Sequence, residues 1–299
     1  MLTTISDLQN TVTTRSDRRS MALAVAQDPQ ALDAAYKATK AGYINAILIG
    51  DKPQILQIAQ QKAYDLSGFD IIHEEDTNWA VEKAVRLVSQ GKASILMKGN
   101  VSTGTLLRAV LNKDWGLRAG ALLSHIALFE LPGYHKLLGL TDVAMNVNPS
   151  LVEKVQIINN AVSFLHRLGI KNPKVAPLCA VETISEKMPP TLDAAILTQM
   201  NRRGQITGCI VDGPLAFDNA ISFHSAKHKG IVSEVAGDAD LLLFPNIEAG
   251  NAVYKALAAF GNGQLAAVIV GASAPIVLTS RSDSEQAKLN SILLAAAAS

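Results

Sequence analysis

The sequence predicts an α/β protein with mostly parallel sheets and helices on both faces. Short runs of aliphatic and β-branched residues alternate with longer stretches whose apolar residues recur at helical spacing. Residues 78–90, for example, place Val81, Ala84, Val85 and Val88 along one face of a helix. Parallel strands need crossover connections, usually helices, so this alternation favours a parallel sheet covered on both sides.

The first part of the chain keeps this rhythm without interruption. Pro29 opens one helical stretch and Gly42 closes it, as is typical of helix starts and ends. The predicted strands here are residues 21–26, 45–50, 70–73 and 93–98, and the predicted helices are residues 29–42, 53–67, 78–90 and 105–112.

The rhythm changes near residue 120. Three apolar segments, residues 121–130, 137–140 and 143–146, are joined by short turns, which indicates hairpin-like pairing and a mixed sheet. Further helices are predicted at 151–168, 191–203, 251–260 and 285–298, and further strands at 174–181, 209–212, 240–244 and 265–270.

This change of rhythm predicts two lobes, although no Gly/Ser-rich linker separates them. We assign residues 1–122 together with 273–299 to the first lobe and residues 123–272 to the second. The last strand and helix are expected to return to the first lobe. The active site is expected in the cleft between the lobes.

Composition excludes several classes of function. The net charge of +1 predicts no general attraction to nucleic acid or to an anionic membrane, so neither is expected as a partner. Two cysteines in 299 residues and a polar N-terminal stretch favour a reducing compartment, and we expect a cytoplasmic protein. No apolar run is long enough to span a membrane. No His/Cys cluster has zinc spacing, and no acidic triplet indicates magnesium, so no metal site is expected.

The turn at residues 279–284 is the strongest candidate for chemistry. Ser280, Arg281 and Asp283 follow an apolar strand region and precede a helix, a junction where parallel α/β proteins place their active sites. The alternative is a plain helix cap, with Ser282, Asp283 or Ser284 accepting a backbone N–H. A cap does not account for Arg281, a cation at the positive end of a helix dipole, unless an anion binds beside it. We therefore favour a catalytic anion site.

Three further segments are candidates for substrate binding. Ser102 and Thr103 lie in a glycine-bearing turn that opens a helix, an arrangement that can hold phosphate. Gly250 and Asn251 lie between a strand and a helix, where an ordinary capped connection is the alternative. Arg118 precedes an apolar strand and is either a second phosphate ligand or a surface arginine.

Several of these motifs occur together in an order that resembles the phosphate acetyltransferase/butyryltransferase family. The resemblance extends from about residue 93 to the C-terminus. The segments Lys98-Gly99 and Leu117-Arg118 look more like the butyryl branch. The motifs are residues 97–108, 212–219, 237–240, 245–251 and 279–283.

The resemblance implies a two-lobed α/β/α fold similar to isocitrate/isopropylmalate dehydrogenase-like proteins. It implies transfer of a short-chain acyl group, butyryl first, between coenzyme A and inorganic phosphate. It also implies a homodimer or higher homo-oligomer, with acyl-CoA and phosphate as partners. No tightly bound cofactor is expected, because coenzyme A is a substrate.

Residue roles follow from the same resemblance. Ser280 and Arg281 match the family's Ser-Arg pair, and Asp283 is the acid nearest to its catalytic aspartate. Transfer would be direct, in a ternary complex, and neither cysteine is needed. Ser102, Thr103, Arg118, Gly250 and Asn251 would bind the substrates.

Three alternatives stay open at this point. One is a phosphate acetyltransferase. The second is a catalytically idle protein that binds CoA esters, which a ligand would stabilise without release of thiol. The third is a metal- and nicotinamide-dependent decarboxylating dehydrogenase of similar fold, which a chelator would inhibit.

Overall fold

A computed structural model describes residues 2–120, 122–278 and 283–299 and divides into two compact units. Unit 1 comprises Met1–Ile5 and Leu122–Leu265, and unit 2 comprises Ser6–Ala121 and Ala266–Ser299. Both units are α/β, so the predicted fold class is confirmed. The lobe boundaries predicted from the sequence, after residues 122 and 272, stay a prediction. Within the described residues, no helix is both long and apolar enough to cross a membrane.

Unit 2 is built on a sheet in the order β3-β2-β1-β4-β11-β10. All neighbours in this sheet are parallel except β10 and β11. Its strands are β1 (Arg19–Ala24), β2 (Ile44–Gly50), β3 (Asp70–His73), β4 (Ile95–Lys98), β10 (Gln264–Val270) and β11 (Ile276–Val277), and its helices are α1 (Ile5–Thr13), α2 (Pro29–Lys40), α3 (Lys52–Gln61), α4 (Thr77–Ser89), α5 (Thr103–Val110) and α11 (Glu285–Ala297).

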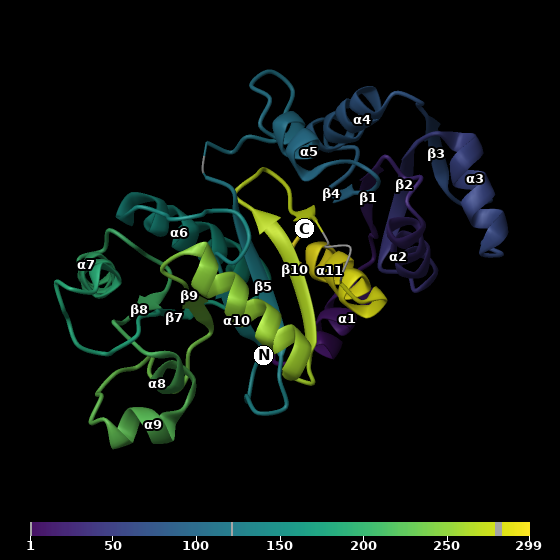
Figure 1. Ribbon diagram of the computed structural model, residues 1–299. Helices are drawn as coiled ribbons and strands as arrows, with labels where there is room; N and C mark the ends of the chain where they lie inside the picture. The colour runs from purple at the N-terminus through teal and green to yellow at the C-terminus, as the bar shows by residue number, and fades with distance from the viewer. Residues whose placement is uncertain (1, 121, 279–282) are drawn as a thin grey trace. The chain divides into compact units, whose positions relative to one another are not determined.

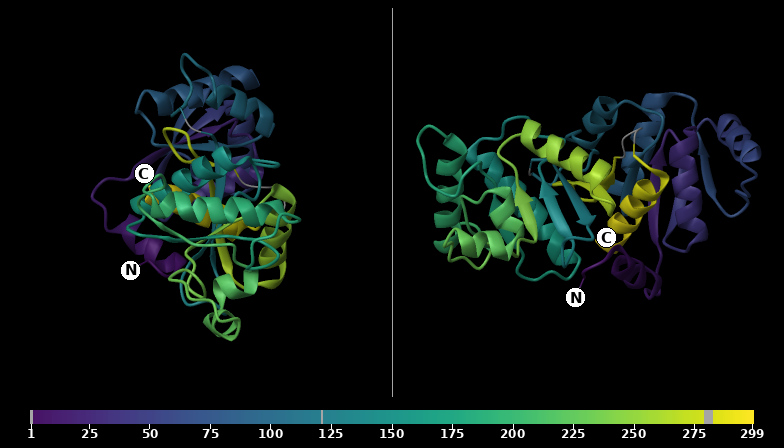
Figure 2. Two further views of the ribbon diagram at one scale, coloured as in Figure 1. Left: turned by 90° about the vertical axis from the view of Figure 1, so that its left-hand side faces the viewer. Right: turned by 60° about the horizontal axis from the view of Figure 1, so that its bottom comes forward.

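Helices cover both faces of this sheet. From β1 the chain proceeds outward through β2 to β3 and then crosses back to β4, so right-handed crossovers place α2 and α4 on opposite faces. Helix α2 contacts α11, and α4 contacts α5, as both views show (Figure 1, Figure 2). Accordingly Met21 to Ala24 of β1 are four consecutive buried residues. The strand order reverses between β1 and β4, which is where open α/β sheets bind ligands.

Helix α11 is fixed within unit 2 at both ends. At its start, the Nζ of Lys37 lies 2.8 Å from the carboxylate of Glu285 and 2.9 Å from that of Asp33. At its end, the guanidinium of Arg15 donates to the carbonyl oxygens of Ala296 and Ala297, at 2.8 Å each. These carbonyls have no partner within the helix, so the arginine satisfies them.

Unit 1 is built on a sheet in the order β5-β6-β9-β7-β8. Strands β5 and β6 form the antiparallel pair expected for this region, and the other neighbours are parallel. Its strands are β5 (Ser124–Glu130), β6 (Leu138–Thr141), β7 (Lys174–Pro177), β8 (Ile210–Val211) and β9 (Leu241–Leu243), and its helices are α6 (Leu151–Arg167), α7 (Pro189–Arg202), α8 (Phe217–Ile221), α9 (Phe223–His228) and α10 (Ile247–Phe260).

Two element predictions are wrong in an instructive way. The helix predicted over residues 53–67 ends at Gln61, because Ala63 has a φ of 53°, which stops the helical ladder. The strand predicted over residues 143–146 is a loop folded around a buried carboxylate, that of Asp142. Val143 is buried in this loop as it would be in a strand, so its hydrophobicity alone does not separate the two.

A network of charges ties together the amino ends of β6, β7 and β9. The carboxylate of Asp238 lies 2.6 Å from the Nζ of Lys174, 2.9 Å from that of Lys136 and 2.8 Å from the Nε2 of His135. Lys136 also reaches Asp240, at 2.7 Å. Partial burial raises the pKa of Asp238, but the hydrogen bonds from Lys174, Lys136 and His135 outweigh burial and hold the pKa well below its usual range.

We predict that Asp238→Asn lowers the free energy of unfolding at neutral pH. The folded carboxyl has a lowered pKa, so its contribution is present above the unfolded pKa of about 3.9 and is lost as the pH falls. We expect a loss of about 1 kcal/mol at pH 7, a discounted value because the side chain is 38% exposed. Urea unfolding at pH 7 and at lower pH measures it, with Asp114→Asn as the exposed control. A loss that does not shrink as the pH falls contradicts the network's role.

Candidate functional site

In the sheet of unit 2, the strand that leads to the turn predicted to carry chemistry lies beside the strand that leads to another predicted loop. Ser280 and Arg281 lie outside the described residues, but the strand that leads to them is described. In the parallel pair β4–β11, Ile276 lies opposite Leu96 and Val277 lies opposite Met97. The chain therefore leaves β11 next to the point where Lys98 ends β4. Residues 99–102 thus leave the sheet at the edge where β11 ends.

The loop after β4 is held against the end of β1. The amide of Gly99 donates to the carbonyl of Ala24 at 2.9 Å, and that of Asn100 donates to the carbonyl of Val25 at 2.8 Å. A Cβ on Gly99 would lie 2.2 Å from the oxygen of Val25, so only glycine fits here. Lys98 donates through Nζ to the carbonyls of Gly99 and Val101, at 3.1 Å each. The conformation of the loop is thus fixed by hydrogen bonds to the end of β1 and to the side chain of Lys98.

The two predicted residues of this loop form the start of α5. Ser102 is the N-cap, and its Oγ accepts the amide of Thr105 at 3.1 Å. Thr103 is the first residue of the helix, and both side chains are exposed. An exposed helix start with free first-turn amides is suited to an anion.

Asp283 lies just before α11, but the cap of that helix is its neighbour. The Oγ of Ser284 accepts the amide of Ala287 at 3.1 Å. Asp283 is half-buried, and its carbonyl oxygen accepts a hydrogen bond of 2.6 Å from the Nζ of the buried Lys288. Because Ser284 provides the cap, capping does not require the carboxylate of Asp283.

The backbone of Arg118 pairs with the turn between β10 and β11 in unit 2. Its backbone forms a bridge with Ala272, in the turn that joins β10 to β11. The amide of Ser273 also donates to the carbonyl of Leu117, at 2.9 Å. This turn precedes β11, so the backbone pairing places Arg118 at the amino end of β11. Residues 279–282 follow β11 in the sequence, after its carboxyl end. The Arg118 side chain is exposed.

In unit 1, a buried aspartate organises the edge where β6 and β9 end. Asp142 follows β6, is 3% exposed, and accepts the amides of Ala144 and Met145 at 2.9 Å each. Its second oxygen accepts the Nδ2 of Asn146 at 2.5 Å, and the same Nδ2 donates to the carbonyl of Leu123. Sequence analysis missed Asp142, although an acid directly after a buried strand is a recognisable signal.

Gly250 and Asn251, two of the predicted residues, hold this aspartate loop in place. Both lie inside α10, whose N-cap is Asn246. A Cβ on Gly250 would lie 2.6 Å from the carbonyl oxygen of Asp142. Asn251 donates through Nδ2 to the carbonyl of Val143 at 3.0 Å. The structure therefore brings these two residues to the Asp142 loop and uses both of them to position its backbone.

His125 lies at the same edge, because β5 is antiparallel to β6 and begins where β6 ends. The register pairs Ala127, two residues after His125, with Leu140, two residues before Asp142. The hydroxyl of Thr141 donates to the carbonyl of His125 at 2.8 Å. The residue is only 7% exposed, the Nδ1 of its ring is enclosed without a partner, and the ring meets that of Tyr254 edge-on. Burial lowers its pKa to about 4, against an opposing effect of Asp142, so the ring is neutral at pH 7.

Neither cysteine is set up as a nucleophile. Burial raises the pKa of the Cys179 thiol to about 11, and it raises that of Cys209 to about 11 as well. The reactive form of cysteine is the thiolate, which is scarce at neutral pH when the pKa is this high. This agrees with a reaction that does not pass through an acyl-cysteine.

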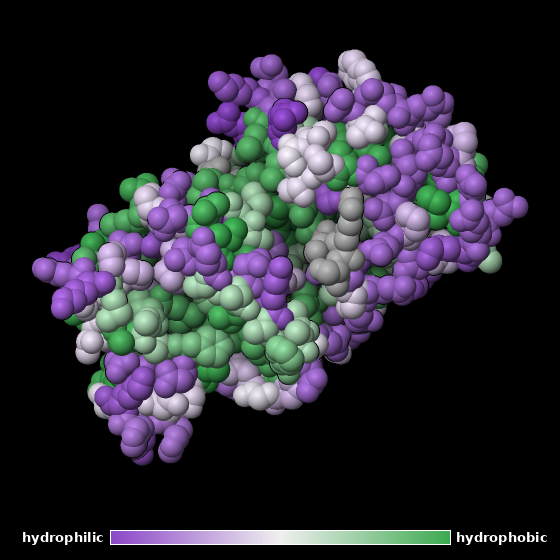
Figure 3. Space-filling view, viewed as in Figure 1, coloured by the Kyte–Doolittle hydropathy of each residue, from purple (hydrophilic) through white to green (hydrophobic). Residues whose placement is uncertain are grey.

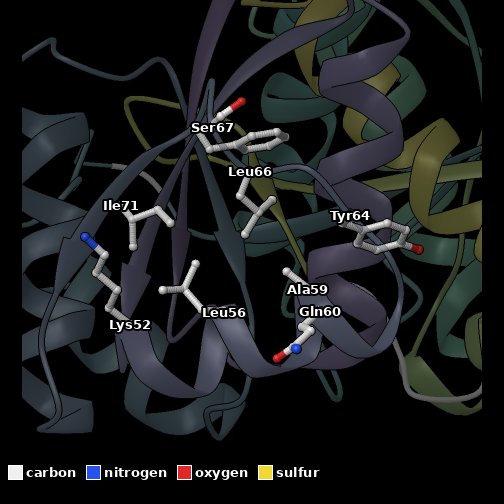
Figure 4. A pocket seen from close by; sticks show the side chains of 9 residues that line it. Lys52, Leu56, Ala59, Gln60, Tyr64, Leu66, Ser67 and Ile71 are labelled. Carbon is white, nitrogen blue, oxygen red and sulfur yellow. The ribbon is translucent and has the colours of Figure 1, made fainter.

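A separate cavity of about 550 Å³ lies between α3 and β3 in unit 2 (Figure 4). Strand β3 is the edge strand, so two further strands, β2 and β1, lie between it and β4. None of the predicted site residues lines this cavity. Its lining is Lys52, Leu56, Ala59, Gln60, Tyr64, Leu66, Ser67, Phe69 and Ile71.

Comparison with known proteins identifies the group to which this chain is related. The sequence pattern described as phosphate acetyl/butaryl transferase matches residues 73–296, which is most of the chain. The chain belongs to the phosphate acetyl/butaryl transferase family. The match includes both segments that flank residues 279–282, the β4 loop, and the Asp142 and Gly250 segments, so all of these lie in the part shared with the family.

Individual members of the phosphate acetyl/butaryl transferase family are similar over nearly the whole chain. A phosphate butyryltransferase from Clostridium acetobutylicum is 53% identical over 94% of this chain and 93% of its own length. A phosphate acetyltransferase from Thermotoga maritima is 40% identical over 94% of this chain and 96% of its own.

Solved structures of other proteins are also similar to this chain. A branched-chain phosphotransacylase from Enterococcus faecalis matches with a TM-score of 0.83 and 34% identity, over 94% of this chain and 98% of that one. A 4-hydroxythreonine-4-phosphate dehydrogenase from Burkholderia phymatum, 13% identical with a TM-score of 0.58 over 95% of this chain and 99% of that one, shares the fold alone. The dehydrogenase-like architecture expected from the sequence is therefore confirmed.

We predict that Gly250→Ala destabilises unit 1 and displaces the Asp142 loop. Alanine suits a helix better than glycine, so a loss of stability is expected from the close contacts that the added Cβ makes with the Asp142 carbonyl and with Val143. Forcing a methyl group into such a site costs about 1–3 kcal/mol. Thermal unfolding of Gly250→Ala measures it, with Gly133→Ala as the control, because a Cβ on Gly133 meets nothing within 4 Å. A variant as stable as the wild type rules out the close fit.

Proposed function

We propose that this protein transfers a short-chain acyl group, butyryl first, between coenzyme A and inorganic phosphate, giving an acyl phosphate and free coenzyme A. The observation that carries this proposal is the 53% and 51% identity to the phosphate butyryltransferases of Clostridium acetobutylicum and Clostridium beijerinckii, over 94% and 93% of this chain. The family match over residues 73–296 spans the segments on which the sequence hypothesis rests.

The proposed reaction is a direct exchange in a ternary complex. A phosphate oxygen attacks the carbonyl carbon of the thioester, the new C–O bond forms, the C–S bond breaks, and the thiolate of coenzyme A leaves and takes up a proton. In the reverse direction the thiol first gives its proton to a carboxylate, which we assign to Asp283. Holding both substrates together supplies orientation without a covalent enzyme intermediate.

We assign to residues of unit 2 the charges that this exchange needs. Arg281 holds the phosphate and offsets the negative charge that develops in the transition state. Ser280 donates a hydrogen bond to the carbonyl oxygen or to the sulfur. Ser102 and Thr103 lie at the start of α5, whose exposed first-turn amides support a second phosphate contact. The register of β11 against β4 supports the grouping of these residues.

The remaining binding residues have different support. Gly250 and Asn251 contribute through the Asp142 loop, which they hold. Arg118 contributes a further phosphate contact, and its exposed side chain is consistent with this role.

We further propose a homodimer or higher homo-oligomer that acts in the cytoplasm. Helix α10 is rich in alanine, only Gly250 is buried in it, and its Phe260 is 83% exposed. The face that carries α10 is green over much of this helix (Figure 3), as an association surface would be. The two cysteines are both free, as expected in a reducing compartment.

A thiol-release assay tests the proposed reaction. We expect butyryl-CoA to release free thiol only when phosphate is added, and we expect acetyl-CoA and a branched acyl-CoA to react more slowly. Faster release from acetyl-CoA would make the protein a phosphate acetyltransferase. Binding of CoA esters without any thiol release would leave a binding protein and exclude the transferase.

We predict that Arg281→Ala raises the half-saturating phosphate concentration and lowers turnover while the fold is kept. Loss of a charge-assisted contact to phosphate is worth roughly 1.5–3 kcal/mol, or about 10- to 100-fold in kcat/KM for phosphate. Steady-state kinetics with varied phosphate measure the change, and Arg203→Ala, an exposed arginine at the end of α7, is the matched control. An unchanged phosphate dependence in Arg281→Ala removes this residue from the site.

A further inference from the structure

We propose that the cavity between α3 and β3 is a separate ligand site, which binds a monocarboxylate with a straight apolar chain such as octanoate. The cavity lies within unit 2, and its lining residues fall between positions 52 and 71. Binding there does not depend on the acyl transfer proposed above.

The cavity exists because α3 covers the edge strand of the sheet incompletely. The buried residues of α3 are Ile55 and Ala59, whereas Leu56 is 44% exposed. Strand β3 is the edge strand, and its Ile71 is only half-buried. Apolar walls thus enclose a space of about 550 Å³ above the small side chain of Ala59. Volumes of about 300–1,000 Å³ are typical of small-molecule sites.

The cavity is elongated along α3. The residues that this helix contributes recur at helical spacing and share one face, and they are Lys52, Leu56, Ala59 and Gln60. At about 1.5 Å per residue, they span about 12 Å along the helix. In Figure 4, Lys52 and Tyr64 lie at opposite ends of the lining. A groove of this length suits one extended chain such as that of octanoate.

The end of the cavity at Tyr64 is rigid. The Tyr64 ring stacks on that of Tyr36, with centroids 4.1 Å apart and planes 9° apart, and Tyr36 also stacks on Phe69 at 5.8 Å. The hydroxyl of Tyr64 donates to the buried carboxylate of Asp33. Because Tyr64 and Phe69 both line the cavity, this end is formed before a ligand arrives, and binding has little ordering cost there.

The other end of the cavity carries a cation. Within the described part of the chain, Lys52 donates through its backbone amide to the Nδ1 of His73 at 3.2 Å, and its ammonium group forms no ion pair. The neighbouring carboxylate of Asp51 is used by the backbone amide and side chain of Gln54. A carboxylate at this end pairs with the ammonium while its chain covers Leu56. One cation balances one negative charge, which favours a monocarboxylate over a phosphate monoester.

Titration of methyl-labelled protein with octanoate, below its micelle concentration, tests the assignment. We expect octanoate to shift the NMR signals of the Leu56 and Ile71 methyl groups. The signals of Leu111, which is also 44% exposed, should stay unchanged. Each methylene removed from the chain weakens apolar binding by about fourfold, so hexanoate is expected to bind roughly 15-fold more weakly than octanoate.

Matched variants separate the two ends of the ligand. We expect Lys52→Gln to weaken octanoate by about two- to fivefold, as for one exposed ion pair, and to leave the binding of 1-octanol unchanged. Lys113→Gln, an exposed lysine elsewhere in unit 2, is its control. Leu56→Gln is expected to weaken both ligands by about 10-fold, with Leu111→Gln as the control.

All four substituted side chains are exposed, so the fold is kept, and melting temperatures check this. The proposal is overturned if octanoate leaves the Leu56 and Ile71 signals unshifted, or if it shifts Leu111 equally. It is also overturned if Lys52→Gln binds octanoate as tightly as the wild type, because the carboxylate then has no partner in this cavity. Since the titration contains neither acyl-CoA nor phosphate, its failure and the failure of the thiol-release assay are independent results.

Discussion

The pairing of β11 with β4 is the constraint on which the candidate site of unit 2 depends. Strand β11 has only two residues, yet its parallel register fixes where the chain leaves the sheet before residues 279–282. Glu285, at the start of α11, is held by Lys37 of α2. A strand from the far end of the chain is thereby inserted next to one from its first third. The predicted anion turn and the predicted glycine-bearing loop consequently follow adjacent strands.

In unit 1, close contacts between α10 and the loop after β6 fix the position of that loop. The loop after β6 is folded around the carboxylate of Asp142, and α10 approaches that loop so closely that only glycine fits at position 250. Asn251 then completes the contact with a hydrogen bond to Val143. Gly250 and Asn251, residue types that are typical of ligand loops, thus contact the backbone of the Asp142 loop. Through these contacts they position the polar groups at the end of β6.

The sequence was sufficient for the fold class and most long elements, because helical periodicity and apolar runs report burial directly. It predicted α2, α4 and α6 within a few residues and the antiparallel pair of β5 and β6. It missed α8 and α9, which are too short to show a period, and the two-residue β11. Of the site, the turn before α11 and the start of α5 could be found from residue types. Asp142 and His125 could not be recognised as residues of one strand edge, because only the antiparallel pairing of β5 with β6 brings the start of β5 to the end of β6.

The division of the chain has a consequence for how the protein is made. Unit 1 consists almost entirely of one continuous segment, whereas unit 2 is assembled from Ser6–Ala121 and Ala266–Ser299. Strand β4 lacks its neighbour β11 until the second of these segments has left the ribosome. Until then Arg15 also lacks the carbonyls of Ala296 and Ala297, which it caps. During synthesis the nascent chain therefore carries an incomplete sheet of unit 2 with an open edge at a stage when all residues of unit 1 have been made. An unpaired β4 edge is a site for pairing with other chains, which makes this interval the one in which aggregation competes with folding.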